Sequence, residues 1–129
     1  MTVTSGVQFI THDGGIAVIR KHLGHASIFG PIVVGNNVFI GYGSILLPNI
    51  RIGDNVLIAA GAVVTRDLPS GVVAAGVPAR PIKTVEEYAK TVSAHAVLIE
   101  HLSPDQKRQF LLERYRPTQS APAGREERR

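Results

Sequence analysis

The chain has 129 residues, enough for one domain, and it contains no cysteine, which excludes disulfides, thiolate metal sites and cysteine nucleophiles. The formal net charge of +4 suits a polyanionic ligand such as a nucleotide, but the interleaved basic and aromatic residues of RNA-binding proteins are missing, so nucleic acid is not an expected partner. Neither a signal peptide nor a run of ~20 apolar residues is found. We therefore expect a cytoplasmic protein without a membrane span.

The first stretch of the chain, up to about residue 30, contains the segment QFITHDGG at residues 8–15 and three histidines. Ile10 and Ile16 lie on a six-residue count that also governs the residues that follow, but His22 breaks this count. An irregular loop inserted near residues 11–30 is therefore predicted. Loops that project from a rigid scaffold often carry catalytic groups, so the histidines of this loop are candidate functional residues.

From residue 28 onward, an aliphatic residue occupies every sixth position over seven hexads. These residues are Ile28, Val34, Ile40, Leu46, Ile52, Ile58 and Val64. A second period of eighteen aligns residues 34–40 (VGNNVFI) with residues 52–58 (IGDNVLI). A period of six suits neither a helix of about 3.6 residues per turn nor an uninterrupted strand. It does suit three short strands and three tight corners in each eighteen-residue coil, with Gly and Asn at the corners because they tolerate positive φ.

The repeat therefore predicts an all-β protein in which residues 1–83 form a parallel β-helix, a solenoid of stacked hexapeptide coils. Successive coils in such a stack lie about 4.8 Å apart, and their inward-pointing aliphatic side chains form a continuous core. The alternative, antiparallel hairpins packed into a sandwich, does not explain why the phase of the hexads is kept over seven repeats.

Two capping-box signatures follow the repeats. Thr84 precedes Glu87 by three residues, and Ser103 precedes Gln106 by three residues with Pro104 at the first helical position. These signatures predict a C-terminal helical segment at 84–116, with helices at about 85–101 and 104–115. We expect the helices to cover the last coil, because an open sheet edge invites aggregation. Residues 117–129, rich in Pro, Ala, Arg and Glu, are predicted to form a disordered tail.

Residues 30–83, which read GPIVVGNNVFIGYGSILLPNIRIGDNVLIAAGAVVTRDLPSGVVAAGVPARPIK, resemble the hexapeptide-repeat acyltransferases. Within that family the stretch is most similar to the maltose and galactoside O-acetyltransferases and to polysaccharide-modifying acetyltransferases. The segment VTRDLPSGVVAAGVPAR is especially specific, and QFITHDGG extends the resemblance to about two thirds of the chain. The resemblance implies a left-handed coil, acetyl-CoA as co-substrate, and a homotrimer with active sites between subunits.

The amino-terminal end departs from the family pattern. Relatives usually have further coils upstream of the histidine loop, whereas this chain begins almost at the loop. Three explanations stay open: an uncovered sheet edge, a cover of another kind, or a sequence that lacks its natural beginning.

Acyl transfer to a hydroxyl needs a base, and histidine suits this task because its pKa lies near neutrality. By resemblance, His12 is the general base that takes the proton of the acceptor hydroxyl, which attacks the thioester directly. From the residues alone, a structural role for His12, in which it caps or packs its loop, explains its position as well as a catalytic role does. A zinc site is the specific rival: the spacing of His22 and His25 could hold zinc on a helix, with His12 as a third ligand. The γ-class carbonic anhydrases share the β-helix that the resemblance implies and use three histidines.

Coenzyme A requires hydrogen-bond donors along its pantetheine arm and cations at its phosphates. By resemblance, main-chain groups of Tyr42 and Ala60, one coil apart, line the arm, and Thr65 follows at the next corner. Arg80 and Lys83 match positions that meet the nucleotide phosphates, for which both residue types are apt. The alternatives are ordinary corner packing for Ala60 and solvated surface for the two cations. Tyr42 departs from the small residue usual in the family.

These observations together predict an acetyl-CoA-dependent O-acetyltransferase that acts on a sugar or glycan hydroxyl and requires no metal. N-acetylation of an amino sugar stays open. Two other functions are retained as alternatives, a γ-carbonic-anhydrase-like zinc enzyme and a non-catalytic β-helix that serves as an assembly module.

Overall fold

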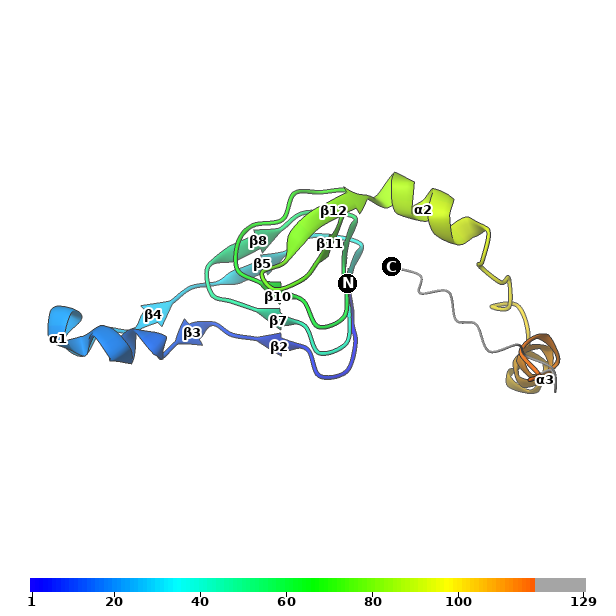
Figure 1. The fold of residues 1–129 in the computed structure, drawn as a ribbon, viewed down its shortest axis with the longest axis horizontal. Coiled ribbons are helices and arrows are strands. Elements are labelled where there is room, and N and C mark those ends of the chain that lie inside the picture. Colours follow the sequence, from blue (N-terminus) through cyan, green and yellow to red (C-terminus); the bar gives the residue numbers. More distant parts are fainter. Residues whose placement is uncertain (118–129) are drawn as a thin grey trace. The chain divides into compact units, whose positions relative to one another are not determined.

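The computed structural model describes residues 1–117. Contacts within the chain group residues 1–95 into one unit and the residues from 96 onward into another, and each unit is described by itself. The first unit contains stacked coils, called the coil stack (residues 1–10 and 31–84), and an excursion from the first coil, called the arm (residues 11–30) (Figure 1).

Each coil contributes strands to faces of the coil stack, and equivalent strands of successive coils pair side by side. The first face contains β1 (Thr2–Val3), β6 (Val38–Ile40), β9 (Val56–Ile58), β11 (Val72–Ala75) and β12 (Arg80–Thr84). The second face contains β2 (Gln8–Phe9), β7 (Ile45–Leu46) and β10 (Val63–Val64). The third face contains β5 (Ile32–Val34) and β8 (Ile50–Ile52), which Leu68 continues through a parallel bridge to Ile52.

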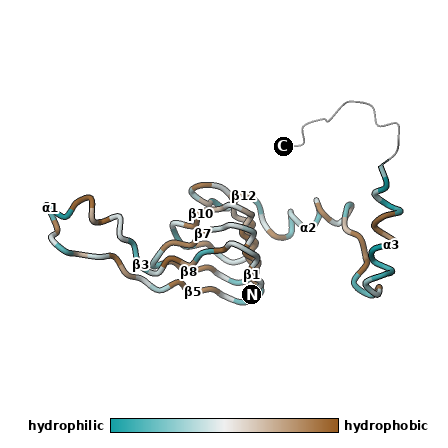
Figure 2. The backbone as a smooth tube through the Cα atoms, turned by 90° about the horizontal axis from the view of Figure 1, so that it is seen from below, coloured by the Kyte–Doolittle hydropathy of each residue, from teal (hydrophilic) through white to brown (hydrophobic). Residues whose placement is uncertain are grey.

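The pairing confirms the predicted eighteen-residue coil. Strand β6 pairs in parallel with β9 at Val38 and Val56, and the pairs β5–β8 and β7–β10 have the same separation of 18 residues. Strand β1 also pairs in parallel with β6, with Thr2 opposite Phe39. The separation here is longer than 18 residues because the arm is inserted in the first coil. The coils therefore form a parallel β-helix with one insertion (Figure 2).

The predicted hexad residues form the core of the coil stack. Five of them are at most 3% exposed: Ile40, Leu46, Ile52, Ile58 and Val64. A second inward row, which the hexad count missed, lies two residues before each of these: Val38, Ser44, Ile50, Val56 and Ala62. Both rows point inward because side chains alternate along a strand, so a three-residue strand presents its first and third residues to the same side. Burial of each large aliphatic side chain contributes roughly 1.5–3 kcal/mol.

Ile28 and Ser44 depart from the pattern of buried aliphatic residues. Ile28, taken as the first hexad residue, does not lie in a coil; it belongs to the arm and is 46% exposed, so this assignment was wrong. Ser44 stands where an aliphatic residue is expected, and its hydroxyl donates to the carbonyl oxygens of Gly41 and Ala59 at 2.8 and 3.0 Å. The core therefore tolerates this polar side chain because its hydrogen-bonding capacity is satisfied.

The corners use Asn and Gly as predicted. Asn37 and Asn55 have φ of 53° and 54° at equivalent positions of successive coils, and the Asn37 amide donates to the Asn55 side-chain oxygen at 2.8 Å. At another corner Gly43 and Gly61 have φ of 67° and 72°. This left-handed region is open mainly to Gly and Asn, which explains why these residue types recur with the coil period.

The arm is a short hairpin with a helical tip. Strands β3 (His12–Asp13) and β4 (Ile28–Phe29) pair in antiparallel fashion. Between them lie the 3₁₀ helix η1 (Gly15–Ile19) and the single-turn helix α1 (Arg20–Leu23). Figure 2 shows the arm leaving the coils beside β3. The arm occupies the stretch near residues 11–30 for which the sequence predicts an inserted loop.

The end of the first unit differs from the sequence-based expectation. The last coil continues into β12, which pairs antiparallel with β11 and was not predicted. Helix α2 (Val85–Ser93) begins at the predicted capping box of Thr84 and Glu87 and contacts β11 and β12. It ends at Ser93, eight residues earlier than predicted. Leu98 beyond it is 88% exposed, and a helix that buries no apolar face gains little stability there.

The second unit contains helix α3 (Pro104–Arg114), which begins at the predicted capping box of Ser103 and Gln106. The disordered tail predicted for residues 117–129 lies, apart from residue 117, outside the described residues. Among the described helices, none combines the length and the apolar character needed to cross a membrane.

Candidate active site

The predicted base, His12, lies in the strand pair β3–β4, where the arm leaves the coil stack. His12 in β3 lies opposite Phe29 in β4, and the two rings stack with their centroids 6.0 Å apart and their planes at 27°. The Gly30 amide donates to the Thr11 carbonyl at 3.0 Å and closes the base of the hairpin. Backbone pairing therefore fixes where His12 leaves the coil stack.

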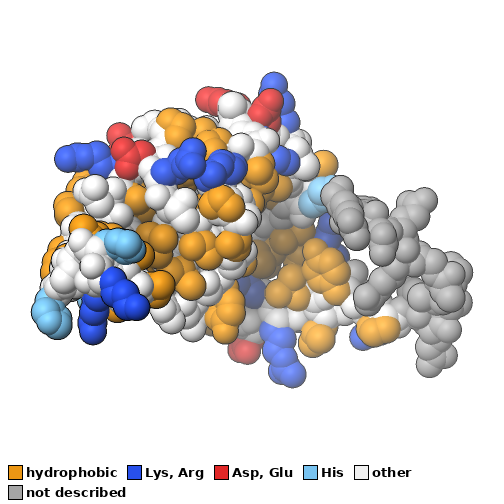
Figure 3. Space-filling model, turned by 60° about the vertical axis from the view of Figure 1, so that its left-hand side comes forward, with side chains coloured by type: hydrophobic (Ala, Val, Ile, Leu, Met, Phe, Trp, Pro, Cys, Tyr) orange, Lys and Arg blue, Asp and Glu red, His pale blue; other side chains and the backbone are white. Residues whose placement is uncertain are grey.

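The rest of the arm is open to solvent. None of its residues is buried, His12 is exposed, and the apolar side chains of Val18, Leu23 and Phe29 are 89%, 53% and 74% exposed. Figure 3 shows hydrophobic, basic and histidine side chains exposed on this side of the molecule. An apolar surface of this kind on a projecting segment is typical of a segment that contacts another molecule.

The structure does not gather the histidines into a metal site. His22 lies in α1 and His25 follows it, and both are exposed at the far end of the arm. His12 instead lies in β3, where the arm leaves the coil stack. Within residues 1–117, no group of three or more His, Cys, Asp or Glu side chains is placed so that it could hold a metal ion.

Tyr42 and Ala60 lie one above the other at the corner between the first and second faces. The Gly61 amide donates to the Tyr42 carbonyl at 2.8 Å, which places the two residues in adjacent coils as predicted. Both residues are exposed, and neither main-chain amide donates to another group within residues 1–117. This corner therefore holds two main-chain N–H groups that have no acceptor within residues 1–117, separated by about one coil spacing of 4.8 Å.

The two predicted phosphate-binding cations lie in β12. Arg80 pairs with Ala75, where β11 runs into the corner that holds Tyr42 and Ala60, and Lys83 pairs with Val73 farther along the strand. Both side chains are half-buried, and Arg80 Nη1 donates to the Ala79 carbonyl at 2.9 Å. The remaining N–H groups of the guanidinium can therefore meet an anion at the carboxyl-terminal end of the corner row.

Thr65 lies at a different corner from Tyr42 and Ala60. It follows β10 and lies at the corner between the second and third faces, from which the arm also leaves the first coil. The second face, a hexad of roughly 15–20 Å of extended chain, separates this corner from the corner of Tyr42. Within one chain the structure therefore divides the predicted site residues between two corners: Thr65 lies at the corner from which the arm with His12 leaves, and His12 is not brought to the corner of Tyr42 and Ala60.

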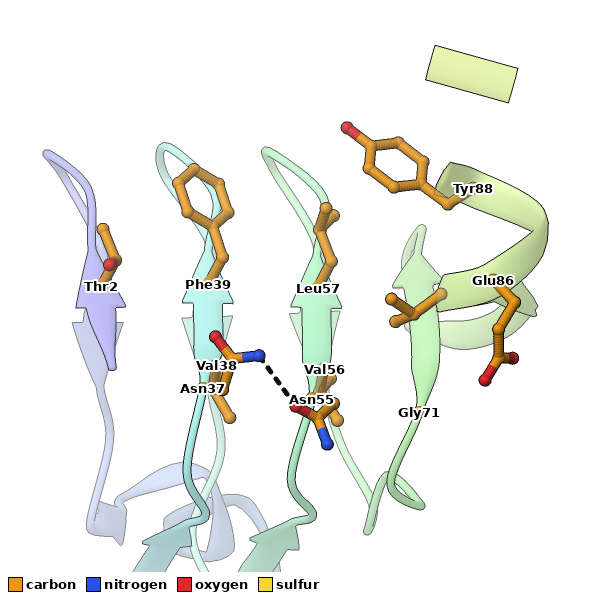
Figure 4. A pocket seen from close by; sticks show the side chains of 11 residues that line it. Thr2, Asn37, Val38, Phe39, Asn55, Val56, Leu57, Gly71, Glu86 and Tyr88 are labelled. Atoms are coloured by element: carbon orange, nitrogen blue, oxygen red, sulfur yellow. Dashed lines mark hydrogen bonds between the residues drawn. The ribbon is translucent and has the colours of Figure 1, made fainter. Parts of the chain in front are cut away.

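One surface feature was not predicted from the sequence. A groove of about 470 Å³ lies on the outer side of the first face, beside α2. Its walls include Phe39, Leu57 and Tyr88, and the hydrogen-bonded amides of Asn37 and Asn55 lie at its base (Figure 4). The sequence could have indicated this groove through Phe39 and Leu57, because they are apolar at outward positions of their strands, where polar residues are expected.

Three comparisons with known proteins agree with this geometry. The family described as bacterial transferase hexapeptide (six repeats) matches residues 31–66. Protein CapG of Staphylococcus aureus is 43% identical over 116 residues, covering 90% of this chain and 67% of CapG. A maltose O-acetyltransferase from Clostridium difficile 630 superposes with a TM-score of 0.56 at 42% identity, over 64% of this chain and 45% of that one. A galactoside acetyltransferase in complex with coenzyme A superposes with a TM-score of 0.55 at 35% identity, over 69% and 47%.

The extent of these matches differs. The chain spans two thirds of CapG and less than half of each of the two solved acetyltransferase chains. The match to CapG nevertheless covers most of the present chain, and the family match lies within the coil stack. The chain therefore belongs to the hexapeptide-repeat acyltransferase family.

Proposed function

We propose that the protein transfers an acetyl group from acetyl-CoA to a hydroxyl of a sugar or glycan. The proposal is supported by the two solved relatives, one a maltose O-acetyltransferase and the other a galactoside acetyltransferase with coenzyme A bound. It includes the left-handed sense of the coil, which the family resemblance implies.

The proposal rests on a row of hydrogen-bond donors at the corner between the first and second faces. It offers the main-chain amides of Tyr42 and Ala60 in successive coils, which have no acceptor within residues 1–117, followed by Arg80 of β12, which pairs with Ala75 at the end of β11. Pantetheine carbonyls need N–H donors at intervals along an extended arm, and phosphates need a cation with several N–H groups. In the proposed arrangement the nucleotide lies toward Arg80 and Lys83, and the thioester lies toward the first coil.

His12 is proposed to act as general base. Its imidazole removes the proton of the acceptor hydroxyl while the hydroxyl oxygen attacks the thioester carbonyl carbon. The tetrahedral intermediate then collapses, the carbon–sulfur bond breaks, and the imidazolium returns the proton to the departing thiolate. The products are an acetyl ester and coenzyme A, and no acyl-enzyme is formed.

A second copy of the chain is proposed to complete the site. His12 and the row of Tyr42 and Ala60 occupy different corners of one chain, so the arm of one subunit must reach the corner row of another. The outer side of the second face also carries apolar side chains, Ile45 and Val63, which suit burial between subunits. Closed symmetry with three copies, as the family resemblance implies, gives every subunit the same pair of contacts.

Coenzyme binding is tested by isothermal titration calorimetry with acetyl-CoA. We expect binding in the micromolar range that weakens as salt is added, because part of it is electrostatic. Arg80→Ala is expected to weaken binding by roughly 10- to 100-fold, the worth of about 1.5–3 kcal/mol for hydrogen bonds to a charged group. The matched control is Arg51→Ala, because Arg51 is an exposed arginine in β8 on the third face.

An absence of heat at millimolar acetyl-CoA contradicts the transferase proposal and leaves the non-catalytic assembly module. Transfer itself is measured as release of free coenzyme A thiol with a panel of sugars and glycans as acceptors. An acetyl product that hydroxylamine removes is an ester, whereas a resistant product is an amide and would reassign the reaction to N-acetylation.

The assembly is tested by sedimentation equilibrium at tens of micromolar protein. A mass of three chains supports the proposed arrangement. A monomer contradicts it, because the predicted site residues of a single chain do not meet.

A further inference from the structure

We propose that Phe29 is the positioning residue of the His12 base, holding the imidazole plane by stacking rather than by a hydrogen bond. This inference rests on the proposed function of His12. It follows from three observations on the arm: the register of its two strands, the contacts that His12 lacks, and the exposure of Phe29.

The register places the two rings together by backbone geometry. His12 and Phe29 are direct partners in the antiparallel pair β3–β4, and the Gly30 amide donates to the Thr11 carbonyl beside them. This pattern makes His12 and Phe29 a non-hydrogen-bonded pair, the type in which the two Cα atoms approach to about 4.5 Å and the side chains lie closest. The observed stack, with centroids 6.0 Å apart, follows from this pairing.

The usual orienting group of a catalytic histidine is not found beside His12 among residues 1–117. A base is normally oriented by a third group that hydrogen-bonds one of its ring nitrogens. Asp13 is the adjacent carboxylate, but its Oδ1 accepts the Gly15 amide at 2.7 Å. Within residues 1–117, neither ring nitrogen of His12 has a hydrogen-bond partner. The stack on Phe29 is therefore the contact that restricts the ring.

Stacking suits this particular reaction. It fixes the plane of the imidazole and leaves both ring nitrogens free, one to take the proton of the hydroxyl and the other to face solvent or a neighbouring subunit. A flat aromatic ring against the imidazole restricts rotation about the side-chain bonds of His12.

Phe29 has no other evident role in the fold. Its side chain is 74% exposed, so it contributes little to the core, and its strand neighbour Ile28 points to the other side of the hairpin. A mostly exposed phenyl ring that stacks on the candidate base is more readily explained by the base than by stability.

The experiment compares Phe29→Ala, Phe29→Tyr and the control Ile28→Ala. Phe29→Ala is expected to lower kcat by roughly 10- to 100-fold, the effect of a base misplaced by about 1 Å, with the KM for acetyl-CoA unchanged. Phe29→Tyr keeps a stacking ring and is expected to restore kcat to within about threefold. Ile28→Ala, with a similar loss of apolar surface on the same strand, is expected to retain the kcat of the unsubstituted protein.

A spectroscopic measurement separates this inference from the proposed reaction. The ring protons of His12 are expected to show an upfield ring-current shift in the NMR spectrum, which Phe29→Ala removes and Phe29→Tyr retains. Full kcat in Phe29→Ala, or His12 ring protons without that shift, overturns the inference. If His12→Ala itself keeps full activity, the proposed function of His12 fails first, and the positioning role falls with it.

Discussion

The coil stack and the arm belong to one unit but are built in opposite ways. In the coil stack the side chains of Ile40, Leu46, Ile58 and Val64 are completely buried, and their positions repeat with the coil. In the arm no residue is buried, and its two strands are held together by one short antiparallel pair and one ring stack. The stability of this unit therefore comes mainly from the repeats, while the candidate base lies in the segment that interrupts them.

Two glycines, one from each region, differ in what surrounds them. A Cβ atom added at Gly41 would lie 2.5 Å from the Ala60 amide nitrogen of the next coil, whereas a Cβ atom at Gly14 in the arm would meet nothing within 4 Å. In the coil stack, glycine allows the backbones of successive coils to approach each other. Four experiments test the contrast between the regions.

The largest expected effect is the loss of turnover on His12→Ala. Removal of a positioned general base lowers kcat by roughly 10²–10⁴. The circular dichroism spectrum, the melting temperature and acetyl-CoA binding should be retained, because His12 lies outside the coil stack. His22→Ala and His25→Ala are controls within the same arm and should cost much less. Comparable losses in all three, together with inhibition by a chelator, would instead support the zinc enzyme.

The next effect is a loss of stability on Ile58→Ala. Ile58 is fully buried between coils, and truncation of such a side chain costs about 2–5 kcal/mol of unfolding free energy. Equilibrium denaturation in guanidinium chloride measures it. A cost below about 1 kcal/mol would mean that the coil stack does not carry the stability of the unit.

A matched pair of glycine substitutions should show a smaller effect. Gly41→Ala is expected to destabilise the protein by about 1–3 kcal/mol, because its new methyl group meets the backbone of the next coil. Gly14→Ala makes the same chemical change where space is open and φ is −84°, so it should be neutral or stabilise by up to ~1 kcal/mol. Equal effects in the same denaturation experiment would contradict the contrast between the regions.

The smallest effect is expected for Tyr42→Ala on acetyl-CoA binding. The proposed contact uses the main-chain amide of Tyr42, which alanine retains, so the Kd should change by less than about threefold, or ~0.7 kcal/mol. Titration calorimetry beside Arg80→Ala provides the scale. A larger gain in affinity would show that the exposed Tyr42 ring narrows the path of the pantetheine arm.

The sequence alone was enough to predict the period, the coil and the first residues of the two helices that begin with capping boxes. The inward row from Ile40 to Val64 and the corner residues Asn37 and Asn55 were readable because each follows from local stereochemistry: alternation along a strand, and tolerance of positive φ. The family could be recognised for the same reason, since its motifs are contiguous in the sequence.

Other features were decided only by tertiary structure. The antiparallel pairing of β12 with β11, the placement of Ile28 in the arm, and the pairing of His12 with Phe29 depend on contacts between distant residues. So does the division of the predicted site between two corners. The hexad count assigns a phase to each residue within a coil, but it does not say which corner faces another subunit or where an insertion directs its side chains. Those properties depend on packing across coils, where residues meet that the period alone does not relate.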